Sequence, residues 1–352
     1  MAESIPAAPA APATDTRLAE LTAWAAAMLR ARDLLVAPAS ADASFRRYFR
    51  LTAGAGGALA PGQRTLIAMD APPAKEDSRP FVHVAALLRA AGVHAPEVLA
   101  ADLDRGFLLL TDLGARTYLA ELDTASAPAL YADAIDALIL WQRASRDGEL
   151  APYDEPLLRR ELDLFPAWYI AKHLGVTLAP AQEQVLANAF RLVLDNNLAQ
   201  PRVFVHRDYH SRNLMVSRPN PGVLDFQDAV HGPITYDLVS LLRDAYIAWD
   251  EERQLDWAAR YWERARRAGL PVAPDFAAFW RDFEWMGVQR QLKVLGIFAR
   301  LAHRDGKTGY LADMPRVMAY LRGACERYAA LGPLLKLLDD LEGRRPAVGY
   351  TF

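Results

Sequence analysis

Residues whose types and spacing suit phosphoryl transfer lie close together between positions 206 and 225. An apolar segment leads into His206 and Asp208, and Asn213 follows Asp208 after four residues. A second apolar segment, after a short turn, leads into Asp225. One carboxylate can orient and deprotonate an acceptor hydroxyl, whereas an amide oxygen and a second carboxylate suit Mg²⁺. We therefore predict Asp208, Asn213 and Asp225 as catalytic residues, with Asp208 as the base and with Asn213 and Asp225 as metal ligands.

This arrangement resembles the protein-kinase pattern H-R-D-x-x-x-x-N followed by D-F-G, with Gln227 in place of the final glycine. The departure points away from protein kinases, and the chain resembles the aminoglycoside phosphotransferase family of small-molecule kinases. The resemblance implies an α+β, bilobal protein-kinase-like fold with a small β-rich N-lobe and a large, mostly helical C-lobe. It also implies ATP and Mg²⁺ as cofactors. We expect His206 to support the catalytic loop and Asp237, in the first turn of the next helix, to brace it.

Longer stretches are similar to one branch of that family, the anomeric N-acetylmuramate/N-acetylglucosamine kinases of bacterial cell-wall recycling. The similar stretches are residues 42–50, 69–73, 79–81, 224–229, 231–233, 241–246 and 290–296. The resemblance implies ATP-dependent phosphorylation of the C1 hydroxyl of the sugar. The product would be a sugar 1-phosphate in peptidoglycan recycling.

The predicted N-lobe departs from the kinase pattern around the phosphates. The phosphate-covering loop, residues 42–48, contains no glycine, and Asp70 stands where the third-strand lysine is expected. A carboxylate beside the phosphates would repel them. We therefore predict that the local cations Arg46, Arg47 and Lys75 bind the nucleotide. Alternation along a strand would place Arg46 and Arg47 on opposite faces, and the sequence leaves open which cation replaces the lysine.

The segment Leu-Leu-Leu-Thr-Asp-Leu-Gly at residues 108–114 separates a β-rich part from a helix-rich part. We interpret it as the hinge, with Thr111, Asp112 and Leu113 in contact with the nucleotide. The predicted order is a disordered Ala/Pro-rich lead-in (1–14) that is not a signal peptide, an N-lobe (15–107), the hinge (108–114) and a C-lobe (115–352).

Hydrophobic periodicity and turn residues predict the individual elements. The expected strands are 45–52, 64–69, 97–101 and 106–111. The expected helices are one that Asp15 caps, then 81–91, 128–145, 155–173, 180–197, 236–249, 254–267, 274–301, 315–328 and 333–341.

The acceptor region is expected in the C-lobe, and its charge indicates an anionic substrate. Residues 281–322 contain eight Arg or Lys but four Asp or Glu. This excess suits a carboxylate such as the lactyl group of N-acetylmuramate, and it argues against polycations. Arg290 and Lys293 are three residues apart, on one face of a predicted helix. We predict that they bind the acceptor together with Asp208 and Asp228.

Composition sets broad limits. The 352 residues are 52% hydrophobic and 24% charged, with a formal net charge of −3, which gives no bias towards nucleic acid or membranes. A single cysteine excludes an internal disulfide, and no apolar run reaches the roughly 20 residues that span a bilayer. We expect a cytoplasmic monomer that acts on a small amino sugar, with no nucleic-acid or membrane partner.

Two alternatives stay open at this point. The first is a kinase for another hydroxyl acceptor, such as an aminoglycoside, choline or homoserine. The second is a catalytically weak nucleotide-binding module, which the missing lysine and glycines favour. The complete set of Asp208, Asn213 and Asp225 argues against the second alternative. The residues do not choose between N-acetylmuramate and N-acetylglucosamine, or between ATP and GTP.

Overall fold

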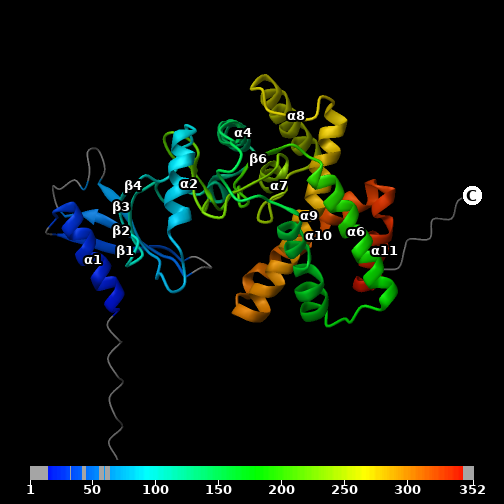
Figure 1. The fold of residues 1–352 in the computed structure, drawn as a ribbon, viewed down its shortest axis with the longest axis horizontal. Helices are drawn as coiled ribbons and strands as arrows, with labels where there is room; N and C mark the ends of the chain where they lie inside the picture. The colour runs from blue at the N-terminus through cyan, green and yellow to red at the C-terminus, as the bar shows by residue number, and fades with distance from the viewer. Residues whose placement is uncertain (1–14, 32, 42–44, 55–58, 60–63, 344–352) are drawn as a thin grey trace, which may run out of the picture. The chain divides into compact units, whose positions relative to one another are not determined.

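The computed structural model describes residues 15–31, 33–41, 45–54, 59 and 64–343, and these form two compact units (Figure 1). One unit runs to Val82 and includes Pro96–Asp112, and the other comprises His83–Ala95 and the chain from Leu113 onward. The predicted lead-in (1–14) and residues 42–44 of the predicted phosphate-covering loop lie outside the described residues.

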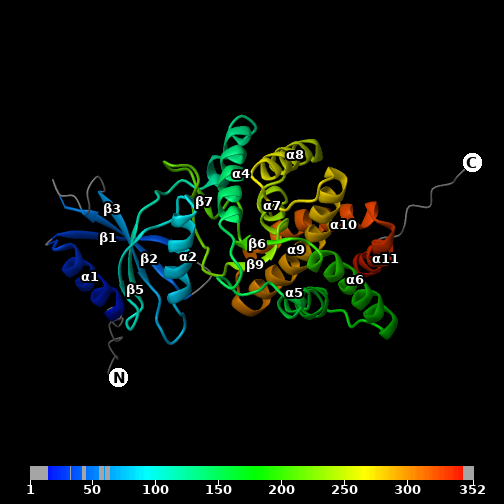
Figure 2. The ribbon, with the colours of Figure 1, turned by 45° about the horizontal axis from the view of Figure 1, so that its top comes forward.

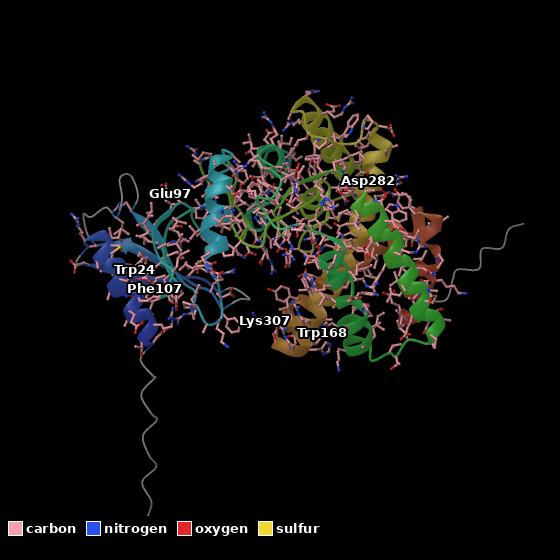
Figure 3. The ribbon with its side chains drawn as sticks, viewed as in Figure 1. Trp24, Glu97, Phe107, Trp168, Asp282 and Lys307 are labelled. Atoms are coloured by element: carbon pink, nitrogen blue, oxygen red, sulfur yellow. The ribbon has the colours of Figure 1, made fainter. Side chains whose placement is uncertain are left out.

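In the described part of the first unit, five antiparallel strands form a sheet of order β1-β2-β3-β5-β4. The strands are β1 Leu34–Ala41, β2 Arg47–Ala53, β3 Thr65–Asp70, β4 Val98–Asp102 and β5 Phe107–Thr111. Helix α1 (Thr16–Leu29) packs on one face, and its predicted cap is confirmed, because the Asp15 side chain accepts a hydrogen bond from the backbone N–H of Leu18. Trp24 of α1 meets Phe107 of β5, with ring centroids 5.8 Å apart (Figure 3).

Strand alternation sorts the side chains of this sheet between its two faces. Leu66 and Ala68 of β3 belong to the apolar core with α1, so the next even-numbered residue, Asp70, lies on that face as well. Strand β1 was not predicted. It contains Pro38 at the sheet edge, with a register shift between Pro38 and Ser40, and an edge strand tolerates the missing N–H of proline.

The second unit is mostly helical (Figure 2). Its helices are α3 Tyr118–Glu121, α4 Ala127–Arg143, α5 Glu155–Leu162, η1 Phe165–His173, α6 Pro180–Leu198, α7 Tyr236–Leu242, α8 Glu251–Arg267, α9 Phe276–Asp305, η2 Thr308–Asp313, α10 Met314–Arg327, η3 Ala329–Leu331 and α11 Gly332–Glu342. Its short strands are β6 Arg202–Val205, β7 Leu214–Met215, β8 Gly222–Val223 and β9 Val230–Pro233, paired as β6 with β9 and β7 with β8. Helix α9 is central, because it packs against η1, α6, α7 and α10.

The bilobal kinase-like architecture is therefore confirmed: a small β-rich lobe and a large helical lobe. Part of α2 (Arg79–Ala90) and the turn after it group with the helical unit. The backbone there pairs with β8, where the N–H of Val223 donates to the carbonyl of His94. The predicted boundary at residue 107 does not anticipate this grouping. Among the described residues, no helix combines the length and apolar character needed to cross a bilayer.

The helix predicted over 155–173 is wrong in one respect, since the chain forms α5 and then the π-helix η1. Pro166 lies in the first turn of η1, where its missing N–H ends the α-helical hydrogen-bond pattern. The helix predicted over 236–249 is also shorter, because α7 ends at Leu242.

Gly296 allows α9 to approach η1. A Cβ placed on Gly296 would lie 2.5 Å from the backbone carbon of Leu164 and 2.6 Å from its carbonyl oxygen. We expect Gly296→Ala to lower the free energy of unfolding by about 1–3 kcal/mol, because the two backbones must separate. Gly323→Ala in α10 is the matched control, with nothing within 4 Å of the added Cβ, and it should be neutral or stabilising. Urea unfolding of both variants measures the difference, and equal stabilities would contradict the close-approach argument.

Candidate active site

The catalytic loop begins where β6 ends, and Asp237 holds its backbone. The N–H groups of His206 and Arg207 donate to the two carboxylate oxygens of Asp237 at 2.7 and 2.9 Å. Asp237 is fully buried in the first turn of α7, and burial raises its pKa to about 7 despite these hydrogen bonds. The predicted bracing role of Asp237 is confirmed.

His206 holds the same loop through its ring. Its Nε2 lies 3.0 Å from the carbonyl oxygen of Leu224, and its Nδ1 lies 3.2 Å from the backbone nitrogen of Asp208. A backbone N–H donates and a carbonyl accepts, so Nδ1 is the acceptor and Nε2–H the donor, which describes a neutral imidazole. Burial is the largest cause that lowers the pKa of His206 to about 4, although the Asp208 carboxylate acts in the opposite direction. The expected supporting role is confirmed.

The buried neutral His206 should contribute acid sensitivity, which the raised pKa of Asp237 opposes. The unfolded chain binds a proton at this side chain below about pH 6.5 and the native state below about pH 4, so stability present above pH 6.5 is lost as the pH falls through this window. The loss attributable to His206 should reach roughly 3 kcal/mol at pH 4. Relative to the parent protein, the unfolding free energy of His206→Gln should increase as the pH falls from 6.5 to 4, measured by denaturant titration. An unchanged slope would show that this histidine is not the acid-sensitive group.

The structure brings the two predicted metal ligands together. The Asn213 amide nitrogen donates to an oxygen of Asp225 at 3.2 Å and to the backbone carbonyl of Asp208 at 3.0 Å. Gln227, which replaces the kinase glycine, donates to the other Asp225 oxygen at 2.8 Å. Asp225 has a φ of +61°, a conformation that Asp and Asn tolerate better than most residues. Groups from the two sides of the β7–β8 hairpin thus converge beside it.

This donor set fits Mg²⁺ in part. With its nitrogen turned towards Asp208 and Asp225, Asn213 offers its carbonyl oxygen, and Asp225 offers carboxylate oxygens, which are hard ligands. Within the described ranges, no group of three or more His, Cys, Asp or Glu side chains could hold a metal. Mg²⁺ commonly binds through one or two carboxylates while substrate phosphates and waters complete its shell. The residues therefore suit a metal that arrives with a nucleotide.

Asp208 is half-buried and ionises readily. Burial acts to raise its pKa, but Lys293, and then His210, Arg207 and Arg290, outweigh burial and lower the pKa below its usual value. The side chain is therefore a carboxylate near neutral pH, as a proton acceptor must be.

A buried ion network lies behind Asp208, and its centre, Glu161 of α5, was not predicted. Glu161 accepts from Arg207 at 2.5 Å, pairs with Lys293 at 3.0 Å and accepts from the Tyr153 hydroxyl. Lys293 also donates to the Tyr236 hydroxyl at 2.9 Å. In the sequence, Glu161 is one acid in a charged helix segment, and no pattern there signals its burial.

The four predicted acceptor-binding residues differ in their surroundings. Asp208 lies in the loop just described, and Lys293 is only 6% exposed and occupied by Glu161. Arg290 is 3% exposed, and its Nη1 has no hydrogen-bond partner. Asp228 is exposed, and its backbone carbonyl accepts from Arg207 at 3.3 Å. Of the two predicted α9 cations, Arg290 is the one whose charge is not already paired.

In the first unit, Asp70 is neutralised rather than turned towards phosphate. Arg17 of α1 donates to one of its oxygens, with Nε at 2.9 Å, and Arg47 donates to the other at 2.5 Å. Arg47 also pairs with Asp15. The guanidinium of Arg47 thus lies between two carboxylates on the α1 face of the sheet, which argues against a role for Arg47 at the nucleotide.

The other predicted nucleotide-binding cations have different neighbours. Arg46 pairs with Glu76 at 3.0 Å, and the Arg46 side chain is only 9% exposed. Lys75 is exposed, with its ammonium 5.4 Å from the centroid of the Phe45 ring. These two cations belong to the chain segments that flank β2 and β3.

Of the predicted hinge residues, Thr111 ends β5, and Asp112 and Leu113 follow it. The Asp112 carboxylate pairs with Arg50 at 2.6 Å, and the Thr111 hydroxyl accepts from the backbone N–H of Glu97 at 2.9 Å. Leu113, the first residue after the division between the units, packs near Gly222, where an added Cβ would lie 2.9 Å from Leu113 Cδ1.

Comparison with known families shows to which family the chain belongs. Residues 36–276 match the model of the phosphotransferase enzyme family. The chain belongs to this family. The match includes Asp208, Asn213 and Asp225 of this phosphotransferase, whereas Arg290 and Lys293 lie beyond its end.

Curated relatives of the phosphotransferase carry one name, N-acetylmuramate/N-acetylglucosamine kinase. The protein from Pseudomonas aeruginosa is 54% identical over 307 residues, covering 86% of this chain and 88% of the relative. The protein from Neisseria meningitidis is 48% identical and covers 96% of this chain and 99% of the relative. The protein from Caulobacter vibrioides is 33% identical, with 85% and 89% covered.

Solved structures with low sequence identity share the fold. An ADP-bound aminoglycoside phosphotransferase superposes with a TM-score of 0.55 at 16% identity, covering 86% of this phosphotransferase and 97% of the other chain. A choline/ethanolamine kinase family protein from Mesorhizobium loti gives 0.59 at 16% identity, covering 90% and 99%. These similarities confirm the kinase-like fold.

Proposed function

We propose that this phosphotransferase transfers the γ-phosphoryl group of ATP to the C1 hydroxyl of N-acetylmuramate or N-acetylglucosamine. The product is the sugar 1-phosphate, in peptidoglycan recycling. The observation that carries the proposal is the convergence of Asn213 and Asp225 beside the ionised Asp208. The name shared by relatives that are 48–54% identical over most of the chain supports the choice of acceptor.

In this reaction the C1 oxygen of the sugar forms a bond to the γ-phosphorus as the bond from that phosphorus to the bridging oxygen of ADP breaks. The hydroxyl proton passes to the Asp208 carboxylate. A hemiacetal hydroxyl is more acidic than an ordinary alcohol because the ring oxygen withdraws electrons. A carboxylate with a lowered pKa, such as Asp208, is then a sufficient base, and catalysis depends mainly on positioning and charge neutralisation.

Asn213 and Asp225 would hold Mg²⁺, which neutralises phosphate charge when bound. Gln227 orients Asp225 through a 2.8 Å hydrogen bond, and Asn213 ties Asp225 to the backbone of the residue that receives the proton. Hydrogen bonds within this part of the chain therefore connect the two metal ligands to the backbone of the base.

For the nucleotide phosphates we favour Arg46 and Lys75. The Arg46–Glu76 ion pair resembles in kind the lysine–glutamate pair of kinases, and an acidic partner can hold the guanidinium in place. Arg47 is occupied by Asp15 and Asp70. Thr111, Asp112 and Leu113 stay our candidates for contact with the nucleotide beyond its phosphates. We further infer that the protein acts in the cytoplasm as a monomer, in line with its single, buried Cys325.

The proposal is tested by incubating the protein with Mg²⁺-ATP and each sugar and examining the product by ³¹P NMR. A sugar phosphate whose phosphorus couples to the anomeric proton is the expected product. If ATP is consumed with an aminoglycoside, choline or homoserine but with neither sugar, the proposed acceptor is wrong and the kinase activity stands. ATP binding without turnover of any acceptor would instead favour the weak nucleotide-binding module.

A further inference from the structure

Arg290 carries a buried charge that no described residue neutralises by direct contact. Its side chain is in the middle of α9, the residue is 3% exposed, and Nη1 has no hydrogen-bond partner. Across the described ranges, no ion pair or hydrogen bond joins this guanidinium to another residue. Other buried cations of this unit are paired: Lys293 with Glu161 at 3.0 Å and Arg243 with Glu284 at 2.9 Å. A desolvated charge without a partner is costly, so its presence calls for a compensating ligand.

Arg290 lies one helical turn before Lys293 on α9, and Glu161, the partner of Lys293, also binds Arg207, the residue before Asp208. The positive charge of Arg290 acts to lower the pKa values of Asp208, His210, Asp237 and Tyr246, which come from the catalytic loop and from the start and end of the α7 region. An acceptor whose hydroxyl points at Asp208 would therefore bind where the charge of Arg290 acts.

Two more nitrogen-bearing side chains, those of His210 and Arg212, belong to the same catalytic loop as Asp208. His210 is 9% exposed, and its Nδ1 has no hydrogen-bond partner. Arg212 is exposed, and its guanidinium lies 3.6 Å from the centroid of the Tyr246 ring. The His210 ring is 5.4 Å from the same Tyr246 ring, so Tyr246 joins the two residues. Arg290 and Arg212 supply the positive charge of this group, whereas burial lowers the pKa of His210.

We propose that Arg290 binds the carboxylate of an acidic amino sugar, the lactyl group of N-acetylmuramate, with His210 and Arg212 at the edge of the same subsite. This rests on the proposed function, in which the C1 hydroxyl of that sugar is the acceptor. The lactyl group is attached to C3, two ring carbons from C1, so a carboxylate there and a hydroxyl at Asp208 belong to one ligand. A guanidinium pairs with a carboxylate through two parallel hydrogen bonds, which an ammonium cannot reproduce.

The proposed subsite predicts that loss of the Arg290 charge weakens binding of N-acetylmuramate more than binding of N-acetylglucosamine. N-acetylglucosamine has the same ring without the lactyl carboxylate, so it makes no ion pair with Arg290. In Arg290→Met, the KM for N-acetylmuramate should rise about 10- to 100-fold, as expected when a charge-assisted contact is lost, and the ratio of kcat/KM for N-acetylmuramate to kcat/KM for N-acetylglucosamine should fall by a similar factor. Arg290→Lys should restore part of the affinity for N-acetylmuramate. Initial rates at saturating Mg²⁺-ATP measure both acceptors.

Arg281→Met is the matched control, because Arg281 is an exposed arginine on the same helix. This substitution should change the KM for neither acceptor. Because methionine removes a buried unpaired charge, Arg290→Met should unfold at a temperature no lower than that of the parent protein. The proposed subsite is wrong if Arg290→Met lowers kcat/KM equally for both sugars or changes it for neither. A raised KM for ATP would also contradict the proposal. If the parent protein phosphorylates neither sugar, the proposed function itself fails, a result distinct from a loss of selectivity.

Discussion

Replacement of Asp208 by Asn is expected to lower turnover by about 10²- to 10⁴-fold, the usual contribution of a positioned base. The nucleotide dissociation constant should change little. The hydrogen bonds of residue 208 to His206 and Asn213 use only its backbone N–H and carbonyl. An asparagine therefore keeps the loop and loses only the ability to take the proton. Initial rates and calorimetric titration with Mg²⁺-ATP measure the two effects.

Asp195→Asn is the matched control for this substitution. Asp195 is an exposed carboxylate on α6, with 65% of its side chain accessible, and its loss should leave turnover unchanged. If Asp208→Asn keeps turnover within a few-fold of the parent protein, the proton acceptor is another group and the assigned mechanism is wrong.

Asp225→Asn is expected to remove most of the advantage that Mg²⁺ gives to nucleotide binding and to abolish turnover. The dissociation constant for Mg²⁺-ATP should rise about 10- to 100-fold, as for the loss of an interaction with a charged group. Asn tolerates the φ of +61° about as well as Asp, so folding should be little changed. Calorimetric titration with ATP, in Mg²⁺ and in a chelator, gives the two constants.

The comparison with the chelator separates metal binding from general damage. In the parent protein the two constants should differ strongly, and in Asp225→Asn they should nearly coincide, with thermal unfolding within a few degrees of the parent. A variant whose affinity still depends on Mg²⁺ to the same degree would argue that Asp225 is not a metal ligand.

The sequence sufficed for the fold class and for the arrangement of Asp208, Asn213 and Asp225. These residues occupy 18 consecutive positions, and a short hairpin leaves few ways to arrange them. Local rules also sufficed for most helices, because capping residues and apolar periodicity act within a few residues. Strand β1 was missed because Pro38 disfavours a strand unless the strand lies at an edge, and the sheet order is a property of the whole unit.

Asp70 shows where local reasoning about charge fails. From the sequence, a carboxylate at the position of the kinase lysine should repel phosphate. In the structure it faces α1, where Arg17, 53 residues away in the chain, and Arg47 neutralise it. The residue type fixes the sign of the charge on a side chain. Which group contacts that charge depends on the helix that covers that face of the sheet.

The sequence by itself thus determined a kinase-like phosphotransferase, because the chemistry of proton transfer and metal binding needs particular residue types at short spacing. Only the tertiary structure distinguished Arg290 from Lys293, two cations one turn apart on α9. Glu161, 132 positions before Lys293 in the sequence, folds against Lys293 and leaves Arg290 without an acidic partner. Ion pairs between distant segments depend on how helices pack, and packing is decided by the burial of apolar surface over the whole unit rather than by the charged residues themselves.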